Sequence, residues 1–139
     1  MHGRSPDRAP GRVRPRLLTR SAVLAMMFAM PKGILYVETR PSAPEREADY
    51  HRWYDEVHLA EVVAIPGFVA ARRYVPVRED GGPFVAIYDV EADDLGDVMR
   101  ALRRVIAEGG FEMSDAIEME PPPVMRLLEL TASYGPAPV

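Results

Sequence analysis

Hydrophobic and polar residues alternate along this chain with a period that changes several times after about residue 30. Side chains repeat every two residues in a strand and about every 3.6 residues in a helix, so each change of period predicts a new element. The predicted elements are, in order, a strand over 34–39, a helix over 44–65, strands over 67–77 and 84–90, a helix between 94 and 109, and a strand over 124–131.

Turn and capping residues separate these elements. The Pro-Gly pair at 66–67 can stop the first helix, because proline lacks an N–H and glycine tolerates positive φ. Residues 79–82 (Glu-Asp-Gly-Gly) have the composition of a hairpin turn. Asp94 is expected to cap the second helix, and the Gly-Gly pair at 109–110 to end it. Residues 111–123 are predicted to form an acidic loop that ends in prolines.

The predicted order β-α-β-β-α-β is that of a ferredoxin-like, or split βαβ, α+β fold with a four-stranded antiparallel sheet and both helices on one face. The strands nevertheless carry apolar residues on both faces. On the second strand we expect Val69, Ala71, Val75 and Val77 on one face, and Phe68, Ala70, Arg72 and Tyr74 on the other. A second layer is therefore implied, and its simplest source is another copy of the same sheet in a two-fold homodimer.

The first 29 residues differ from the rest, because arginines and prolines dominate them. Such a segment cannot bury a core, so we expect disorder up to about residue 17. The apolar stretch 21–30 is too short to span a bilayer. We interpret these first 29 residues, the basic head of the chain, as a mis-annotated extension upstream of an internal start methionine. The alternative is a targeting or membrane-surface segment. The folded domain is predicted to cover 30–136.

Charge and cysteine content exclude several functional classes. The formal charge is −4, and without the basic head the remaining body carries −9. An acidic body repels phosphate backbones, so we expect no nucleic-acid partner, and we expect no membrane partner either. The chain has no cysteine, which excludes disulfides, thiol nucleophiles and Cys-ligated zinc and is compatible with a cytoplasmic location.

The first helix carries the densest candidate chemistry. At about 100° per residue, one predicted side of this helix holds Tyr50, Trp53, Tyr54, Val57, Glu61, Ala64 and Ile65. Glu61 therefore lies within an otherwise apolar stripe. His58 lies at its border, one turn from both Tyr54 and Glu61.

These residues form the pattern W-Y-x3-H-x2-E-x4-P-G, which is found here at Trp53, Tyr54, His58, Glu61, Pro66 and Gly67. With the element order, the pattern resembles the dimeric α+β barrel superfamily and, within it, the EthD-like proteins, over about residues 32–132. The resemblance implies two ferredoxin-like subunits whose sheets form a barrel, with a ligand pocket in each subunit between helices and sheet. Relatives include cofactor-free monooxygenases and aromatic polyketide cyclases. The family commonly has a proline two residues after the histidine, where this chain has Ala60.

His58 and Glu61 are the candidate catalytic pair. An imidazole near neutrality both gives and takes protons, and a carboxylate one turn away could orient it or share the proton. The alternative is a border histidine satisfied by a carbonyl or by water, with Glu61 paired to Arg72 or Arg73.

Five further residues are candidates for substrate binding: Tyr50, Trp53, Tyr54, Arg72 and Tyr74. The aromatic residues of the stripe could equally be core residues, although pockets are lined by such groups. Arg72 could neutralise a carboxylate or enolate substrate, or could form an ion pair within the protein.

No metal or cofactor is expected. His51, Asp55 and His58 have the i, i+4, i+7 spacing of helix-borne metal ligands, but the same spacing occurs on any solvated helix face and no clear fourth ligand is near. The sequence has no phosphate-binding loop and no dinucleotide-binding or zinc spacing.

Three functional classes remain open. The first is a cofactor-independent cyclase, isomerase or oxygenase acting on an apolar carbonyl-bearing or aromatic small molecule, in which His58 moves a proton. The second is an EthD-like oxidoreductase of a degradation pathway. The third is a dimeric ligand-binding protein without turnover.

Overall fold

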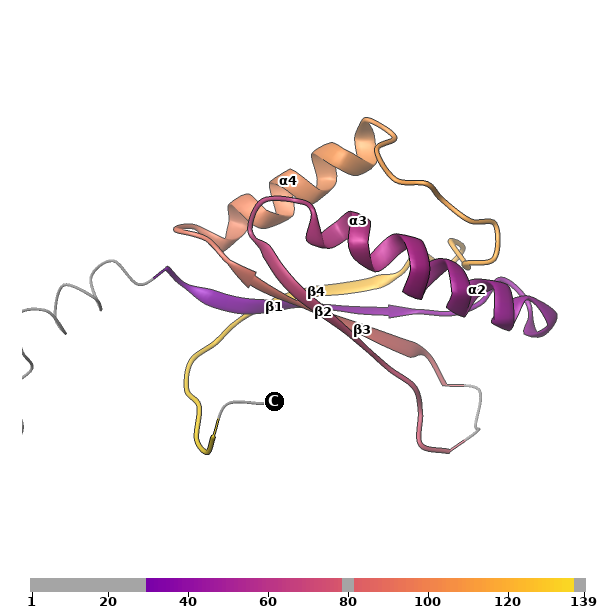
Figure 1. Cartoon of the computed structure of the whole chain (residues 1–139), viewed down its shortest axis with the longest axis horizontal. Coiled ribbons are helices and arrows are strands. Elements are labelled where there is room, and N and C mark those ends of the chain that lie inside the picture. Colours follow the sequence, from indigo (N-terminus) through magenta and orange to yellow (C-terminus); the bar gives the residue numbers. More distant parts are fainter. Residues whose placement is uncertain (1–29, 79–81, 137–139) are drawn as a thin grey trace, which may run out of the picture.

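A computed structural model describes residues 30–78 and 82–136 and shows one antiparallel sheet with its helices on one face (Figure 1). The strands are β1 (Lys32–Thr39), β2 (Phe68–Tyr74), β3 (Phe84–Glu91) and β4 (Val124–Glu129), in the spatial order β2-β3-β1-β4. The helical segments are η1 (Pro44–Arg46), α2 (Glu47–Trp53), η2 (Tyr54–His58), α3 (Leu59–Val63) and α4 (Leu95–Ala107). The predicted ferredoxin-like α+β fold is confirmed. The predicted segment 1–29 and most of the predicted hairpin turn lie outside the described residues.

The core lies between the helices and the centre of the sheet. β1 pairs with both β3 and β4, so that Leu35 stands opposite Tyr88 on one side and Leu127 on the other. Leu35 and Tyr88 are buried towards the helices, where they meet Val98 and Leu102 of α4. Both helices cover this face because each presents an apolar stripe to it.

The first helix contains one π-helical turn. The N–H of Leu59 donates to the carbonyl of Tyr54, five residues back, whereas an α-helix uses a spacing of four. The extra residue rotates everything that follows. Val62 is buried where Glu61 was predicted, and Ala64 is exposed. The predicted stripe is therefore right up to Tyr54 and again at Ile65, which is buried, but wrong at Glu61 and Ala64, because its phase assumed an uninterrupted α-helix.

A β-bulge changes the faces of β2. The pairing of β2 with β3 shifts register between Phe68 and Ala70. Phe68 is buried on the helix side, whereas Arg72 and Tyr74 lie on the outer face. The prediction that Phe68 shares a face with Arg72 and Tyr74 is therefore wrong, because a bulge inserts one residue and reverses the alternation that follows it. β2 also ends at Tyr74, earlier than predicted.

The ends of the helices are closed as the sequence predicts. The side chain of Asp94 accepts a hydrogen bond of 2.8 Å from the N–H of Gly96, and so caps α4. Gly109 ends the helix with φ +67°. Gly67 has φ +97° in the turn between α3 and β2, and a Cβ there would approach Val98 Cγ2 to 2.9 Å.

No helix of the described residues covers the outer face of the sheet (Figure 1). Tyr74 and Leu128 are exposed on this face, with Tyr74 48% accessible. Arg72 and Asp89 form a bidentate ion pair there, with distances of 2.7 and 3.0 Å. This partly apolar face is the observation that favours a second layer.

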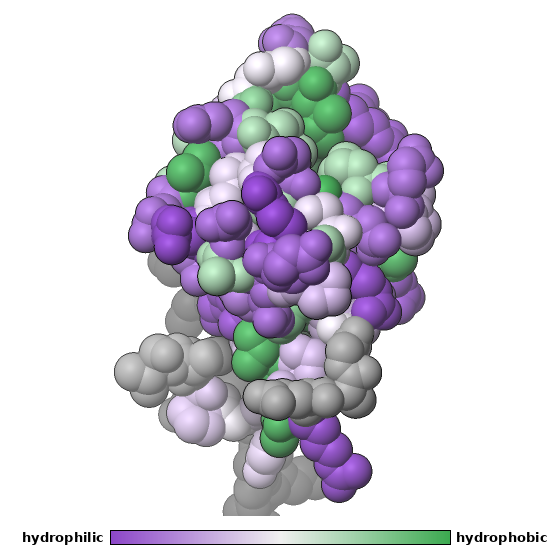
Figure 2. Space-filling view, turned by 90° about the vertical axis from the view of Figure 1, so that its right-hand side faces the viewer, coloured by the Kyte–Doolittle hydropathy of each residue, from purple (hydrophilic) through white to green (hydrophobic). Residues whose placement is uncertain are grey.

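One end of the molecule has a different character. Figure 2 shows the end of the molecule at which β1 runs into α2, and this end is mainly hydrophilic. Apolar surface gathers towards the top of that view, at the level of the C-terminal end of α4. No helix in the described part of the chain is long and apolar enough to cross a membrane.

Candidate functional site

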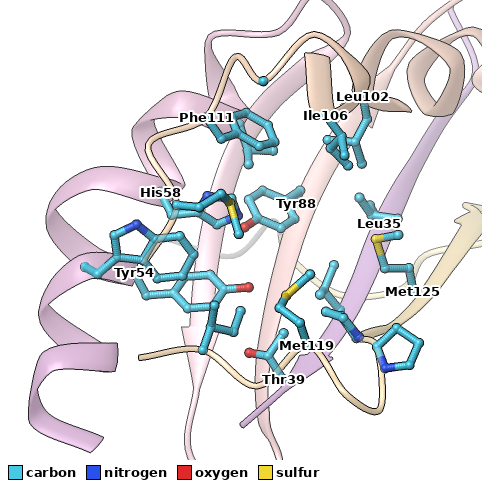
Figure 3. Close-up of a pocket in the computed structure, with 18 residues that line it drawn as sticks. Leu35, Thr39, Tyr54, His58, Tyr88, Leu102, Ile106, Phe111, Met119 and Met125 are labelled. Atoms are coloured by element: carbon cyan, nitrogen blue, oxygen red, sulfur yellow. The ribbon is translucent and has the colours of Figure 1, made fainter. Parts of the chain in front are cut away.

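An apolar cavity of about 400 Å³ lies between the sheet, the first helix and α4 (Figure 3). Its size is within the range of small-molecule pockets. The helices and strands contribute Leu35, Val37, Thr39, Trp53, Tyr54, His58, Val62, Tyr88, Leu102, Ile106 and Met125 to its lining. The segment between α4 and β4 contributes Gly109, Phe111, Met113, Ile117, Met119, Pro122 and Pro123.

His58 stands in the pocket wall among aromatic rings. It stacks on Trp53 with a centroid distance of 4.6 Å and an interplanar angle of 21°. The rings of Tyr54 and Phe111 meet it edge-on at 5.2 and 5.1 Å. These contacts leave 14% of the side chain accessible and fix the orientation of the imidazole.

Burial lowers the pKa of His58 below its ordinary value, and the charge of Glu61 opposes this shift only in part. Glu61 Oε1 lies 3.8 Å from His58 Nδ1, and neither atom has a hydrogen-bond partner among the described residues. Burial therefore favours the neutral imidazole, whereas the nearby Glu61 carboxylate favours its protonated form. An imidazole with these two neighbours can act chemically as a general base.

Glu61 and Trp53 also hold the loop that follows α4. The N–H of Glu112 donates to Glu61 Oε2 at 2.8 Å, and the carbonyl of the same residue accepts from the indole N–H of Trp53 at 2.7 Å. One peptide segment is thus fixed to the first helix at two points. Because Phe111 precedes it, these bonds also place a wall of the pocket.

Tyr50 lies beside the pocket, not in its lining. Its hydroxyl shares a hydrogen bond of 2.5 Å with Thr39 Oγ1, and Thr39 does line the cavity. The Arg73 guanidinium lies 4.4 Å from the centre of the Tyr54 ring and 5.2 Å from that of Tyr50. Its side chain is only 9% accessible and pairs with Asp55 at 2.7 Å. A buried cation therefore stands directly behind the tyrosines.

Two predicted substrate-binding residues lie outside the pocket. Arg72 and Tyr74 are on the outer face of the sheet, where Arg72 pairs with Asp89. These two residues are therefore not part of the pocket between helices and sheet, because the bulge in β2 turns Arg73 inward instead. The alternative that Glu61 pairs with Arg72 or Arg73 is wrong, since both arginines have aspartate partners.

Two of the three candidate metal ligands, His51 and Asp55, are engaged in other contacts. Arg73 donates to His51 Nδ1 at 3.0 Å as well as to Asp55, while His58 faces the pocket. Within residues 30–78 and 82–136, no group of three or more metal-ligating side chains is placed to hold an ion.

Several pocket residues were missed by the sequence analysis. Tyr88 and Thr39 looked like ordinary strand residues, and Phe111 and the three methionines lie in or next to a segment read as an acidic loop. A signal was present in the regular spacing of Met113, Met119 and Met125, six residues apart. Methionines in a polar loop indicate an adaptable apolar contact surface.

Comparison with known proteins supports the fold and leaves the chemistry open. No protein-family model and no curated protein sequence matches the chain. A solved structure with the same fold is that of a "putative monooxygenase" from Shewanella loihica PV-4, with a TM-score of 0.52 and 13% identity. The similarity covers 76% of this chain and 99% of that one. At this identity the similarity supports the ferredoxin-like α+β fold of the chain alone, while the resemblance to the dimeric α+β barrel superfamily and to its EthD-like proteins stays a prediction.

Proposed function

We propose that the protein is an enzyme that moves a proton on a small, apolar, carbonyl-bearing or aromatic substrate without a cofactor. The observation that carries the proposal is an imidazole in an apolar cavity with a Glu61 carboxylate oxygen 3.8 Å from its Nδ1. In such a pair the imidazole accepts the proton as a general base and the carboxylate stabilises the resulting imidazolium.

His58 and Glu61 are sufficient for the proposed proton transfer. With Nδ1 turned to Glu61, Nε2 of His58 is the nitrogen that takes a proton from a carbon next to the substrate carbonyl. The electrons of the broken C–H bond form a C=C bond, and the carbonyl becomes an enolate oxygen. Glu61 stabilises the imidazolium, and the same proton returns to another position, to a cyclised product or to the original carbon. In an oxygenase of this type, the substrate anion itself would react with O2, and the name of the structural neighbour keeps that class open.

The apolar lining supports the substrate class. The rings of Tyr54 and His58 from the first helix lie on one side of the cavity, and Met119 and Met125 lie towards the other (Figure 3). Thioether sulfurs make favourable contacts with aromatic rings. A flat aromatic ketone fits such walls better than a charged metabolite does, because none of the described residues that line the pocket is Asp, Glu, Lys or Arg.

A homodimer is part of the proposal. The outer face of the sheet exposes Tyr74 and Leu128 and has no layer over it in the described residues. A second copy packed there would cover both sheets and complete a barrel. The pocket lies on the opposite face, so each subunit would keep its own.

Deuterium exchange tests the proposal directly. α-Tetralone, a bicyclic aromatic ketone with acidic protons next to its carbonyl, is incubated with the protein in D2O and followed by proton NMR. We expect the wild-type chain to accelerate exchange at C2 and His58→Gln to abolish the acceleration. His51→Gln, which removes an imidazole outside the pocket, is the matched control and should retain it. Tight binding with no acceleration would indicate the alternative function, a ligand-binding protein without turnover.

A further inference from the structure

The hydroxyl of Tyr88 is a buried polar group without a partner. Tyr88 lines the pocket from β3 and is 2% accessible, and its hydroxyl oxygen has no hydrogen bond of normal geometry to any described residue, although the Tyr54 side chain lies close enough to affect its pKa. A buried hydroxyl left unpaired costs about 1 to 3 kcal/mol of folding free energy. Native proteins retain such a group where a bound water, an ion or a ligand supplies the partner, or where the group has a catalytic role.

The Tyr88 ring is fixed, so its hydroxyl has a fixed direction. Its sheet neighbours are Leu35 on β1 and Ala71 on β2, and Phe68 meets the ring edge-on at 5.9 Å. In Figure 3 its oxygen points to the side of the pocket that carries Tyr54 and His58. A ligand atom bonded to this oxygen would therefore lie near the candidate base.

The surroundings favour a hydrogen-bond acceptor on the ligand. Burial, and next to it the proximity of Tyr54, raise the pKa of Tyr88, so the hydroxyl keeps its proton and is able to donate. The positive charge of Arg73 is felt at both tyrosines from behind the wall. A positive potential stabilises a ligand oxygen that carries partial negative charge, and it stabilises that oxygen more strongly when the negative charge increases, as it does in an enolate.

We propose that Tyr88 is the residue that recognises the substrate's oxygen: its hydroxyl donates a hydrogen bond to the carbonyl of an aromatic ketone whose rings fill the apolar pocket. This inference rests on the proposed function and deepens it, because the oxygen held by Tyr88 is the one that becomes the enolate oxygen. Tyr88 is thus a specificity-determining residue for ketones over hydrocarbons.

A matched pair of probes tests this role. α-Tetralone and tetralin have the same bicyclic frame and differ by the carbonyl oxygen, and their dissociation constants can be measured by calorimetry. We expect the wild-type chain to bind the ketone about tenfold more tightly, because the partner hydroxyl is already desolvated. Tyr88→Phe should remove this preference and leave tetralin binding unchanged. Tyr36→Phe, which removes a hydroxyl bonded to Glu38 on the outer face, is the control and should change neither constant.

Infrared spectroscopy distinguishes direct recognition of the carbonyl from a purely structural role of Tyr88, because a structural role would not change the carbonyl stretching frequency of the bound ketone. The carbonyl stretch of ¹³C-labelled α-tetralone should shift to lower frequency in the wild-type complex and return towards its value in an apolar solvent with Tyr88→Phe. A wild-type complex without this shift, or a ketone preference that survives Tyr88→Phe, would overturn the assignment and leave the His58 proposal standing. Ketone recognition without His58-dependent deuterium exchange would overturn the proposed reaction instead. Failure of both probes to bind the wild-type chain would remove both proposals.

Discussion

Trp53 connects the core, the pocket and the loop after α4, so its replacement gives a graded test of the structure. The side chain is 8% accessible, stacks on His58 and donates its indole N–H to the carbonyl of Glu112 at 2.7 Å. Trp53→Phe keeps a ring against His58 and removes the donor, whereas Trp53→Ala removes both.

The two substitutions differ in expected cost. A buried tryptophan hides about 200 Å² of surface, which at about 25 cal/mol per Å² corresponds to roughly 5 kcal/mol as an upper bound. We therefore expect Trp53→Ala to reduce the free energy of unfolding by about 3 to 5 kcal/mol, a large share of the stability of a domain of this size. For Trp53→Phe we expect about 1 to 2 kcal/mol, which combines the lost hydrogen bond with a smaller ring. That cost corresponds to a melting temperature lower by roughly 5 to 10 °C.

Urea unfolding followed by far-ultraviolet circular dichroism is the suitable assay, because both variants lack the single tryptophan and its fluorescence. Equal midpoints for Trp53→Phe and the wild type would show that the bond to Glu112 contributes nothing. A cost below about 1 kcal/mol for Trp53→Ala would refute the placement of this residue in the core.

The remaining predictions concern pH, backbone strain and assembly. The pKa of His58 in the folded chain lies below its unfolded value of about 6.5, so the unfolded chain binds the proton more readily, and we expect this residue's contribution to stability to fall as the pH drops from about 6.5 to the folded pKa. In an NMR titration, Glu61→Gln should lower the pKa of His58 further. A raised pKa would contradict the roles assigned to burial and to the Glu61 charge. Gly67→Ala should lower the free energy of unfolding by about 1 to 3 kcal/mol, since φ there is +97° and the new Cβ would crowd Val98; an unchanged midpoint in thermal melting would argue against that turn. We expect a chain restricted to residues 30–136 to be dimeric by light scattering and to melt as the whole chain does. A monomer with a much lower midpoint would contradict both the proposed dimer and the predicted domain boundary.

The sequence by itself determined the order and type of the elements. Hydrophobic periods, the Asp94 cap and the glycine at 109 are local signals, and each depends on residues within a few positions of one another. The ferredoxin-like fold follows from that order. The sequence also identified His58 and Glu61 as neighbours, because residues one helical turn apart meet in any helix.

Only the tertiary structure decided which side chains share the pocket. The π-helical turn at 54–58 and the bulge at the start of β2 each shift the side-chain direction by one residue, and neither has a clear local signal. These two shifts bury Val62 in place of Glu61 and turn Arg73 inward in place of Arg72. The unpaired hydroxyl of Tyr88 is likewise invisible in the sequence, because the lack of a partner is a property of everything packed around it.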